Sequence, residues 1–335
     1  MNILFLLEDT TPTDEFRYVQ TLINSINEND ITMQVAFVGG GAPADLAYQL
    51  MKEQVVNKLS FKAQKPTYCS LLAKYIDQVG VDVVVTSRAY FEGEGKKHNI
   101  SEVLDKCKGS PKVIFVGHDC SSVVTEHAQA LSQYNPFYVA VSCLVAERFM
   151  KPFDPLVIYG AAVMPQSSDT DIRKHYGINP KMKLFGYIGN LDLIDTDIVV
   201  EAVKRMGGGL IVCGTGQKLS ALSEVKGPIK VMPIMPEARA DWYRAFTCFL
   251  YPVRQAGFPS LPLESILCGT PVAMTPVSDF YALFKGNIGF GGLSTGELVD
   301  AVDRTKSIDW KRTAGLVENE FSVERMVGGW YSVLG

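Results

Sequence analysis

The stretch QAGFPSLPLESILCGT, from Gln255 to Thr270, has residue types and spacing that suit anion binding. It follows the β-rich run Cys248–Tyr251, and a helix is predicted to begin at Pro262, because proline is favoured in the first turn of a helix. The free N–H groups and positive dipole of a helix N-terminus attract an anion such as a diphosphate. Gly257 would let the ligand approach the backbone closely.

Glu264 is the carboxylate of this stretch and lies one turn into the predicted helix. An ionised carboxylate can accept two hydrogen bonds from a ribose diol. The alternative is that Glu264 only stabilises the first helical turn. The residue type and its position alone leave both roles open.

His118 and Asp119 directly follow the predicted strand Lys112–Gly117. His118 could hydrogen-bond or polarise a bound substrate, or it could simply cap a loop. Asp119 could orient the imidazole or receive a proton, and a helix N-cap is the alternative. We take both as candidate catalytic residues.

The remaining histidines and the cysteines give no metal-ligand spacing. His98 and His127 are expected at the surface, and His175 at a helix end. The seven cysteines form no CxxC pair and are expected to be reduced, which favours a cytoplasmic protein. The Asp-Thr-Asp triplets at 169–171 and 195–197 are predicted to be acids at helix N-termini.

Short apolar runs alternate with helical patterns along the chain, which predicts an α/β fold with parallel, doubly wound sheets. The first set of predicted strands is Ile3–Leu7, Thr32–Val38, Val81–Thr86, Lys112–Gly117 and Phe137–Ser142. The second set is Leu156–Ile158, Lys183–Ile188, Gly209–Cys213, Lys230–Met232, Cys248–Tyr251 and Thr270–Met274.

The restart of this pattern divides the chain. We expect a boundary near residues 155–165, with an N-terminal Rossmann-like domain at 1–158 and a C-terminal one at 159–318. In such sheets, ligands bind beyond the carboxyl ends of the strands. Residues 92–99, EGEGKKHN, are predicted to be a mobile loop, and the glycines 39–41 could face a phosphate or an acceptor.

Length and composition exclude several classes of protein. The chain has 335 residues and a net charge of −4, so no strong overall positive field would attract a polyanion. No apolar run reaches the roughly 18 residues of a membrane span, and stable membrane insertion is not expected.

The stretch A-G-F-P-S-L-P-L-E-S-I-L-C-G-T-P-V, from Ala256 to Val272, resembles a signature of the retaining, sucrose-synthase-like glycosyltransferases of group 1, which have the GT-B architecture. LFGYIGNLD (184–192), LIVCGTG (210–216), VSCLVAERF (141–149) and GHD (117–119) resemble further family segments in the same order. The resemblance implies two Rossmann-like domains facing a cleft, and FSVERMVGGWYSVL (321–334) resembles the family's closing helix, so the last segment at 319–335 is expected to pack back towards the N-terminal domain. In such an enzyme His118 would hydrogen-bond the transferring sugar or polarise the acceptor. The resemblance also implies these donor-binding residues: Gly189, Asn190, Arg254, Gly257, Phe258, Pro259, Ser260, Leu261 and Glu264.

The chain departs from the family at charged positions. Ala256 stands where the family has its first carboxylate, while Asn190 and Asp195 replace an Arg and a Lys that grip the diphosphate. Two charge-assisted contacts, each worth about 1.5–3 kcal/mol, would be lost. Arg254 or Lys218 could compensate in part.

The resemblance implies transfer of a sugar from a nucleotide-sugar donor, with a UDP-sugar as the leading candidate, with retention and with neither cofactor nor metal. The acceptor could be a glycan, a small molecule or a protein. Hydroxymethylated DNA, as for phage enzymes, is an alternative acceptor; it would use Tyr90, Lys96 and Lys97. A non-catalytic binding or partner subunit is the other alternative.

Overall fold

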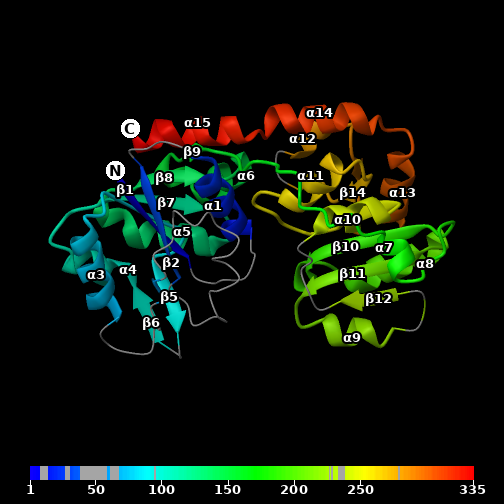
Figure 1. Ribbon diagram of the computed structural model, residues 1–335, viewed down its shortest axis with the longest axis horizontal. Helices are drawn as coiled ribbons and strands as arrows, with labels where there is room; N and C mark the ends of the chain where they lie inside the picture. The colour runs from blue at the N-terminus through cyan, green and yellow to red at the C-terminus, as the bar shows by residue number, and fades with distance from the viewer. Residues whose placement is uncertain are drawn as a thin grey trace. The chain divides into compact units, whose positions relative to one another are not determined.

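The computed structural model describes residues 1–7, 14–26, 31–37, 59–60, 68–93, 96–225, 227, 229–232, 238–277 and 280–335. These residues form two compact units (Figure 1). Unit 1 comprises Met1–Ala161 together with Val323–Gly335, and unit 2 comprises Ala162–Ser322. The glycines at 39–41 lie outside the described residues.

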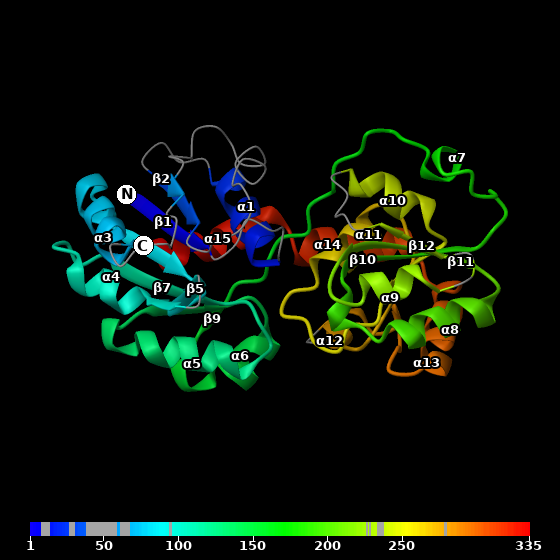
Figure 2. The ribbon, with the colours of Figure 1, turned by 90° about the horizontal axis from the view of Figure 1, so that it is seen from below.

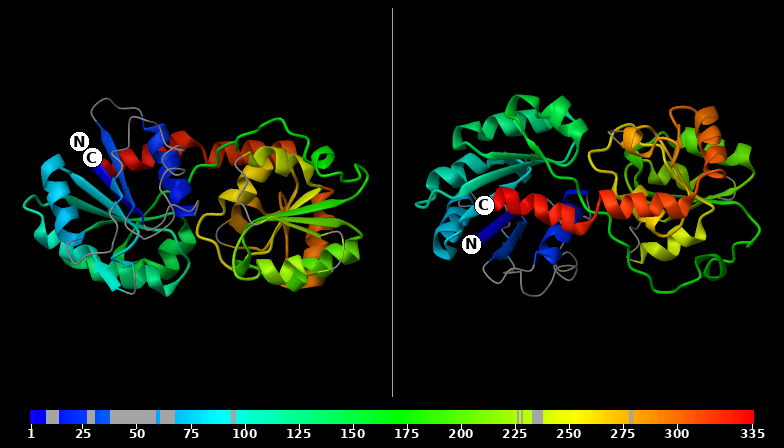
Figure 3. Two further views of the ribbon diagram at one scale, coloured as in Figure 1. Left: turned by 60° about the horizontal axis from the view of Figure 1, so that its bottom comes forward. Right: turned by 90° about the horizontal axis from the view of Figure 1, so that it is seen from above.

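Unit 1 has a parallel sheet in the order β3-β2-β1-β4-β7-β8-β9. Its strands are almost entirely apolar, as expected for strands covered on both faces. Figures 2 and 3 show α5 and α6 on one face of the sheet, and α1 and α15 on the other. The elements are β1 (Asn2–Leu7), α1 (Asp14–Ser25), β2 (Thr32–Phe37), β3 (Leu59–Ser60), α3 (Tyr68–Val79), β4 (Val83–Thr86), β5 (Tyr90–Gly93), β6 (Lys96–Asn99), α4 (Ile100–Lys106), β7 (Lys112–Gly117), α5 (Ser122–Leu131), β8 (Phe137–Ala140), α6 (Cys143–Phe149), β9 (Leu156–Val157) and α15 (Val323–Leu334).

Unit 2 has a parallel sheet in the order β12-β11-β10-β13-β14-β15. Helices α8 and α13 pack together on one face of it, and α10 and α11 lie on the other (Figure 3). The elements are α7 (Ile172–His175), β10 (Leu184–Asn190), α8 (Thr196–Met206), β11 (Gly209–Thr215), α9 (Leu219–Ser223), β12 (Ile229–Met232), α10 (Arg239–Ala245), β13 (Cys248–Tyr251), α11 (Ser260–Leu267), β14 (Val272–Met274), α12 (Phe280–Phe284), β15 (Gly289–Phe290), α13 (Thr295–Thr305) and α14 (Trp310–Glu320).

The predicted α/β class with parallel, doubly wound sheets is therefore confirmed. The predicted mobile loop at 92–99 is wrong, because β5 and β6 form an antiparallel hairpin with Tyr90 opposite Asn99. None of the described helices combines the length and the apolar character that crossing a bilayer requires.

The last helix, α15, completes unit 1. Its Trp330 is buried and donates a hydrogen bond from Nε1 to the hydroxyl of Tyr18 in α1, 2.9 Å away. That hydroxyl in turn donates to the carbonyl oxygen of Ile158 at 3.1 Å. These two hydrogen bonds link three parts of unit 1 that are distant in sequence: α15, α1 and the residue that follows β9.

Candidate functional site

The loop after β13 leads into α11, which begins at Ser260 with Pro259 as its N-cap. The helix therefore starts two residues earlier than predicted, and Pro262 is its third residue. That position still lies within the first turn, where a missing N–H removes no helical hydrogen bond.

Several candidate donor residues in this loop are buried. Phe258 packs its ring against Phe280 and Phe321 at centroid distances of 5.8 and 5.6 Å. Leu261, Gly257 and Pro259 are also buried, and Ser260 is partly exposed. The side chain of Phe258 is part of the hydrophobic core of unit 2, so only the backbone of this residue could contact a ligand.

Glu264 lies in the middle of a buried polar cluster. Arg239 of α10 grips it with two hydrogen bonds, Nε to Oε2 at 2.7 Å and a terminal nitrogen to Oε1 at 2.8 Å. The hydroxyl of Tyr243 donates to Oε2 at 3.2 Å. Coulombic attraction to Glu264 raises the pKa of Arg239 against the opposing effect of burial, so the guanidinium stays charged. The cluster gives Glu264 a structural role beyond stabilising the first turn of its helix, because the carboxylate links α11 to α10.

Near their carboxyl ends, β10 and β11 each carry a glycine, and the two glycines are paired in the sheet. Gly214 lies so close to Gly189 that a Cβ on Gly214 would stand 1.8 Å from the Gly189 carbonyl oxygen. At the end of β10, the side chain of Asn190 accepts a hydrogen bond from the Asp192 amide at 2.9 Å. Asp192 accepts in turn from the Gln217 amide at 3.0 Å. Asn190 therefore shapes the loop in the place where the family has a cation.

Asp195 is the N-cap of α8 and accepts hydrogen bonds from the amides of Asp197 and Ile198. Asp171 likewise caps α7, so the acids of both triplets lie at helix N-termini as predicted. Arg254 approaches Asp195 to 3.8 Å with its side chain 73% exposed. It is therefore a cation that solvent and ligands can reach.

Lys218 does not provide a second accessible cation of this kind. Its ammonium donates to the carbonyl oxygen of Ile194 at 2.6 Å, which joins the loops after β10 and β11. The expected compensation for the missing cations thus rests on Arg254.

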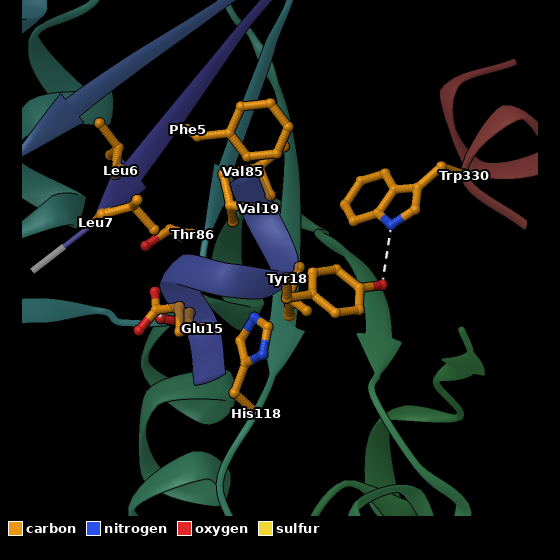
Figure 4. A pocket seen from close by; sticks show the side chains of 12 residues that line it. Phe5, Leu6, Leu7, Glu15, Tyr18, Val19, Val85, Thr86, His118 and Trp330 are labelled. Atoms are coloured by element: carbon orange, nitrogen blue, oxygen red, sulfur yellow. Dashed lines mark hydrogen bonds between the residues drawn. The ribbon is translucent and has the colours of Figure 1, made fainter. Parts of the chain in front are cut away.

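In unit 1, a small pocket opens at the carboxyl ends of β1, β4 and β7 (Figure 4). Tyr18 lies between Trp330 and His118, and its ring meets the imidazole edge-on at a centroid distance of 5.0 Å. Glu15 accepts a hydrogen bond from the Ser87 hydroxyl at the same pocket. Burial, followed by the charge of Arg88, lowers the pKa of His118 to about 3. A neutral imidazole can both donate and accept a hydrogen bond.

Asp119 is exposed and lies 3.8 Å from Arg88. The predicted alternative of a helix N-cap is wrong for Asp119, because Ser121 occupies the N-cap of α5. Arg88 thus lies near both candidate catalytic residues, 3.8 Å from Asp119 and close enough to lower the pKa of His118. Nothing in the sequence around Arg88 singled it out.

The candidate acceptor residues lie on the β5–β6 hairpin. The ring of Tyr90 packs against His127 at a centroid distance of 4.3 Å. Lys96 and Lys97 belong to β6. The expectation that His127 lies at the surface is wrong: it is 3% exposed and its Nδ1 accepts a hydrogen bond from the Ala89 amide. In the described part of the chain, no group of three or more His, Cys, Asp or Glu residues could hold a metal ion.

Comparison with solved structures shows that the chain has the fold of GT-B glycosyltransferases. Anabaena Alr3699/HepE in complex with UDP-glucose superposes with a TM-score of 0.77 at 15% identity, covering 100% of this chain and 99% of the other. Sucrose-phosphate synthase from Thermosynechococcus elongatus gives a TM-score of 0.72 at 13% identity, with the same coverage of both chains.

Residues 182–306 match the family model described as Glycosyl transferases group 1. This part of the chain is therefore a group 1 glycosyltransferase domain, and it contains the loop after β13 and Glu264. The chain is also 28% identical over 190 residues to the lipopolysaccharide core biosynthesis mannosyltransferase LpsB of Rhizobium meliloti (strain 1021). That match spans about half of each protein, 52% of this chain and 49% of the relative.

Proposed function

We propose that this protein is a glycosyltransferase that moves a sugar from a nucleotide-sugar donor to an acceptor, with UDP-sugars as the donor class. The observation that carries the proposal is the group 1 match over residues 182–306, the segment that holds α11 and Glu264. Structural neighbours solved with UDP and with UDP-glucose support the choice of nucleotide.

Donor binding is assigned to unit 2. The N-terminus of α11 and the exposed guanidinium of Arg254 would stabilise the leaving diphosphate. We propose that the reaction retains the configuration at the anomeric carbon and proceeds by attack on the same face without a metal ion. Gly189, Asn190 and Glu264 would complete the donor contacts.

Acceptor binding is assigned to unit 1, with His118 and Asp119 as candidate catalytic residues. A neutral His118 would hydrogen-bond the transferring sugar or the acceptor hydroxyl, and the exposed carboxylate of Asp119 would receive a proton. The similarity to a mannosyltransferase of lipopolysaccharide core biosynthesis favours a glycan acceptor. Hydroxymethylated DNA, contacted by Tyr90, Lys96 and Lys97, is the alternative to include in an acceptor screen.

The thermal stability of the protein should be measured with UDP-, GDP-, ADP- and TDP-sugars and the free nucleotides. A ligand at 100 times its Kd stabilises the folded state by about 2.7 kcal/mol. We expect a shift with UDP ligands that Glu264→Gln abolishes. Glu201→Gln is the matched control, because Glu201 forms an exposed pair with Arg205 on α8.

A non-catalytic partner subunit is the second candidate, and the polar cluster at Glu264 favours it. Three hydrogen bonds already reach this carboxylate, and Asn190 and Asp195 serve the backbone where family members carry cations. If no nucleotide shifts the melting temperature, the transferase proposal fails and this candidate replaces it.

A further inference from the structure

The polar cluster around Glu264 determines how many hydroxyl groups this carboxylate can hold. Each carboxylate oxygen has two acceptor positions, so an ionised glutamate offers about four. Oε2 accepts from the Nε of Arg239 and from the hydroxyl of Tyr243, which occupies both of its positions. Oε1 accepts from a terminal nitrogen of Arg239. Among the contacts of the described residues, one acceptor position remains, on Oε1.

The guanidinium of Arg239 is firmly held in this arrangement. Both of its hydrogen bonds to Glu264 are between charged groups, and such bonds are about twice as strong as bonds to a neutral donor. The Glu264 side chain is only 8% exposed and that of Arg239 only 19%. A neutral ribose hydroxyl that displaced the guanidinium would leave a buried charge without its partner, so displacement is unfavourable.

Tyr243 is equally fixed. Its ring is fully buried and meets Phe249 at a centroid distance of 5.2 Å. Its carbonyl oxygen accepts a hydrogen bond from the Thr270 hydroxyl at 2.7 Å, which ties the end of α11 to α10. The third donor to Glu264 is therefore part of the core and cannot move aside for a ligand.

We propose that Glu264 holds a single ribose hydroxyl, so that the donor site accepts 2′-deoxyribonucleoside diphosphates about as well as ribonucleoside diphosphates. The inference rests on the proposed function, since it assumes that a nucleotide binds at α11. Arg239 is then the residue that sets the preference between ribose and deoxyribose. A vicinal diol would need one acceptor position on each carboxylate oxygen of Glu264, and Arg239 occupies such a position on both.

The test is the dissociation constant of the full-length protein for UDP, 2′-deoxyUDP and 2′,3′-dideoxyUDP, measured by calorimetry. A second charge-assisted hydrogen bond to the ribose would favour UDP over 2′-deoxyUDP on the order of 10- to 100-fold. We expect UDP and 2′-deoxyUDP to bind within about threefold, because the 3′-hydroxyl can fill the one position on Oε1. The dideoxy compound, which has no hydroxyl to offer, should bind at least about tenfold more weakly.

Arg239→Lys provides the second measurement. A lysine ammonium keeps the charge beside Glu264 but cannot reproduce the two parallel hydrogen bonds, so it frees one acceptor position. The preference for UDP over 2′-deoxyUDP should then rise to about tenfold. Arg244→Lys, on the same helix but with its side chain 51% exposed beside Asp241, is the control and should keep the wild-type ratio.

The outcomes separate this inference from the proposed function. A wild-type preference for UDP above about threefold would overturn the inference and leave the transferase proposal standing. An unchanged ratio in Arg239→Lys would overturn the role of Arg239. Failure of the wild-type protein to bind any of the three nucleotides would overturn both the inference and the proposed function.

Discussion

His118 and Tyr18 meet edge to face, with their ring centroids 5.0 Å apart and their planes at 81°. This contact places the candidate catalytic imidazole against a side chain that is itself fixed by Trp330 and Ile158. The last helix of the chain thereby supports the pocket at the carboxyl ends of β1, β4 and β7. This packing buries the imidazole of His118, and burial is the largest cause of its lowered pKa.

We predict that His118 makes the protein less stable in mild acid. Burial and the charge of Arg88 lower its pKa to about 3 in the folded state, against about 6.5 in the unfolded chain. Between these values the unfolded state binds the extra proton, so the free energy of unfolding is highest above pH 6.5 and falls as the pH drops towards 3.

Urea unfolding from pH 8 to pH 4 should show this decline in the wild-type protein and a smaller decline in His118→Asn. The exposed residue His175 provides the control variant, His175→Asn. An NMR titration in which the His118 ring protonates near pH 6.5 would contradict the prediction.

We predict that Tyr18→Phe lowers the free energy of unfolding by about 1–3 kcal/mol, because it leaves the buried Nε1 of Trp330 without its acceptor. Chemical denaturation would measure the loss. Tyr134→Phe is the control, since its hydroxyl bonds the exposed Asp105 carboxylate and the carbonyl oxygen of Ser101 and, within the described part of the chain, is the acceptor of no buried indole. Equal losses in the two variants would show that the Tyr18–Trp330 bond has no special role.

Asp241 should stabilise the segment that leads from β9 to α7. Burial alone would raise its pKa, but hydrogen bonds from Ser167, Ser168 and Thr170 outweigh this and lower the pKa to about 2. The carboxylate therefore stabilises the fold above about pH 4, and this contribution is lost as the pH falls towards 2.

Asp241→Asn should cost about 1–3 kcal/mol at pH 7 and much less near pH 2, as measured by urea unfolding at both pH values. Asp169→Asn is the matched control, because Asp169 is exposed and bonds only Ser167 among these residues. A pH-independent loss in Asp241→Asn would argue against the ionised carboxylate as the cause.

Gly214→Ala should destabilise unit 2 by about 3 kcal/mol or more, because the new methyl group would collide with the Gly189 carbonyl oxygen. If UDP binds at unit 2 as proposed, the displaced end of β10 should also weaken its binding, which calorimetry would measure. Gly315→Ala in α14 meets nothing within 4 Å and should stabilise the protein by about 0.5–1 kcal/mol. If both variants behaved alike, close packing of the β10 and β11 ends would not matter.

Most elements could be predicted because their signals are local. The apolar runs that became β7 and β13, and the acids that became the caps Asp171 and Asp195, are visible within a few residues. The β5–β6 hairpin was not predicted, because residues 92–99 are charged and glycine-rich and show no apolar alternation. Elements without a periodic hydrophobic pattern escape this kind of reasoning.

The candidate site was predicted less completely, because its contacts join residues far apart in sequence. Glu264 was identified from its loop, but the Arg239 that neutralises it lies 25 residues away. His127 was expected at the surface because its partner, the Ala89 amide, is 38 residues distant. A single residue type gives no indication of partners so distant in sequence. The sequence could therefore identify Glu264 but not the side chains that donate hydrogen bonds to it.

Unit 1 is discontinuous, whereas unit 2 is a single continuous segment, Ala162–Ser322. During translation, all of unit 2 emerges from the ribosome before Trp330 does, and domains generally fold as units while the chain is made. Unit 2 can therefore reach its native state before the indole of Trp330 is available to donate its hydrogen bond to Tyr18. Synthesis of unit 1 thus begins first and is completed last. A chain that stalls or is cut before Trp330 would contain a folded unit 2 and an incomplete unit 1.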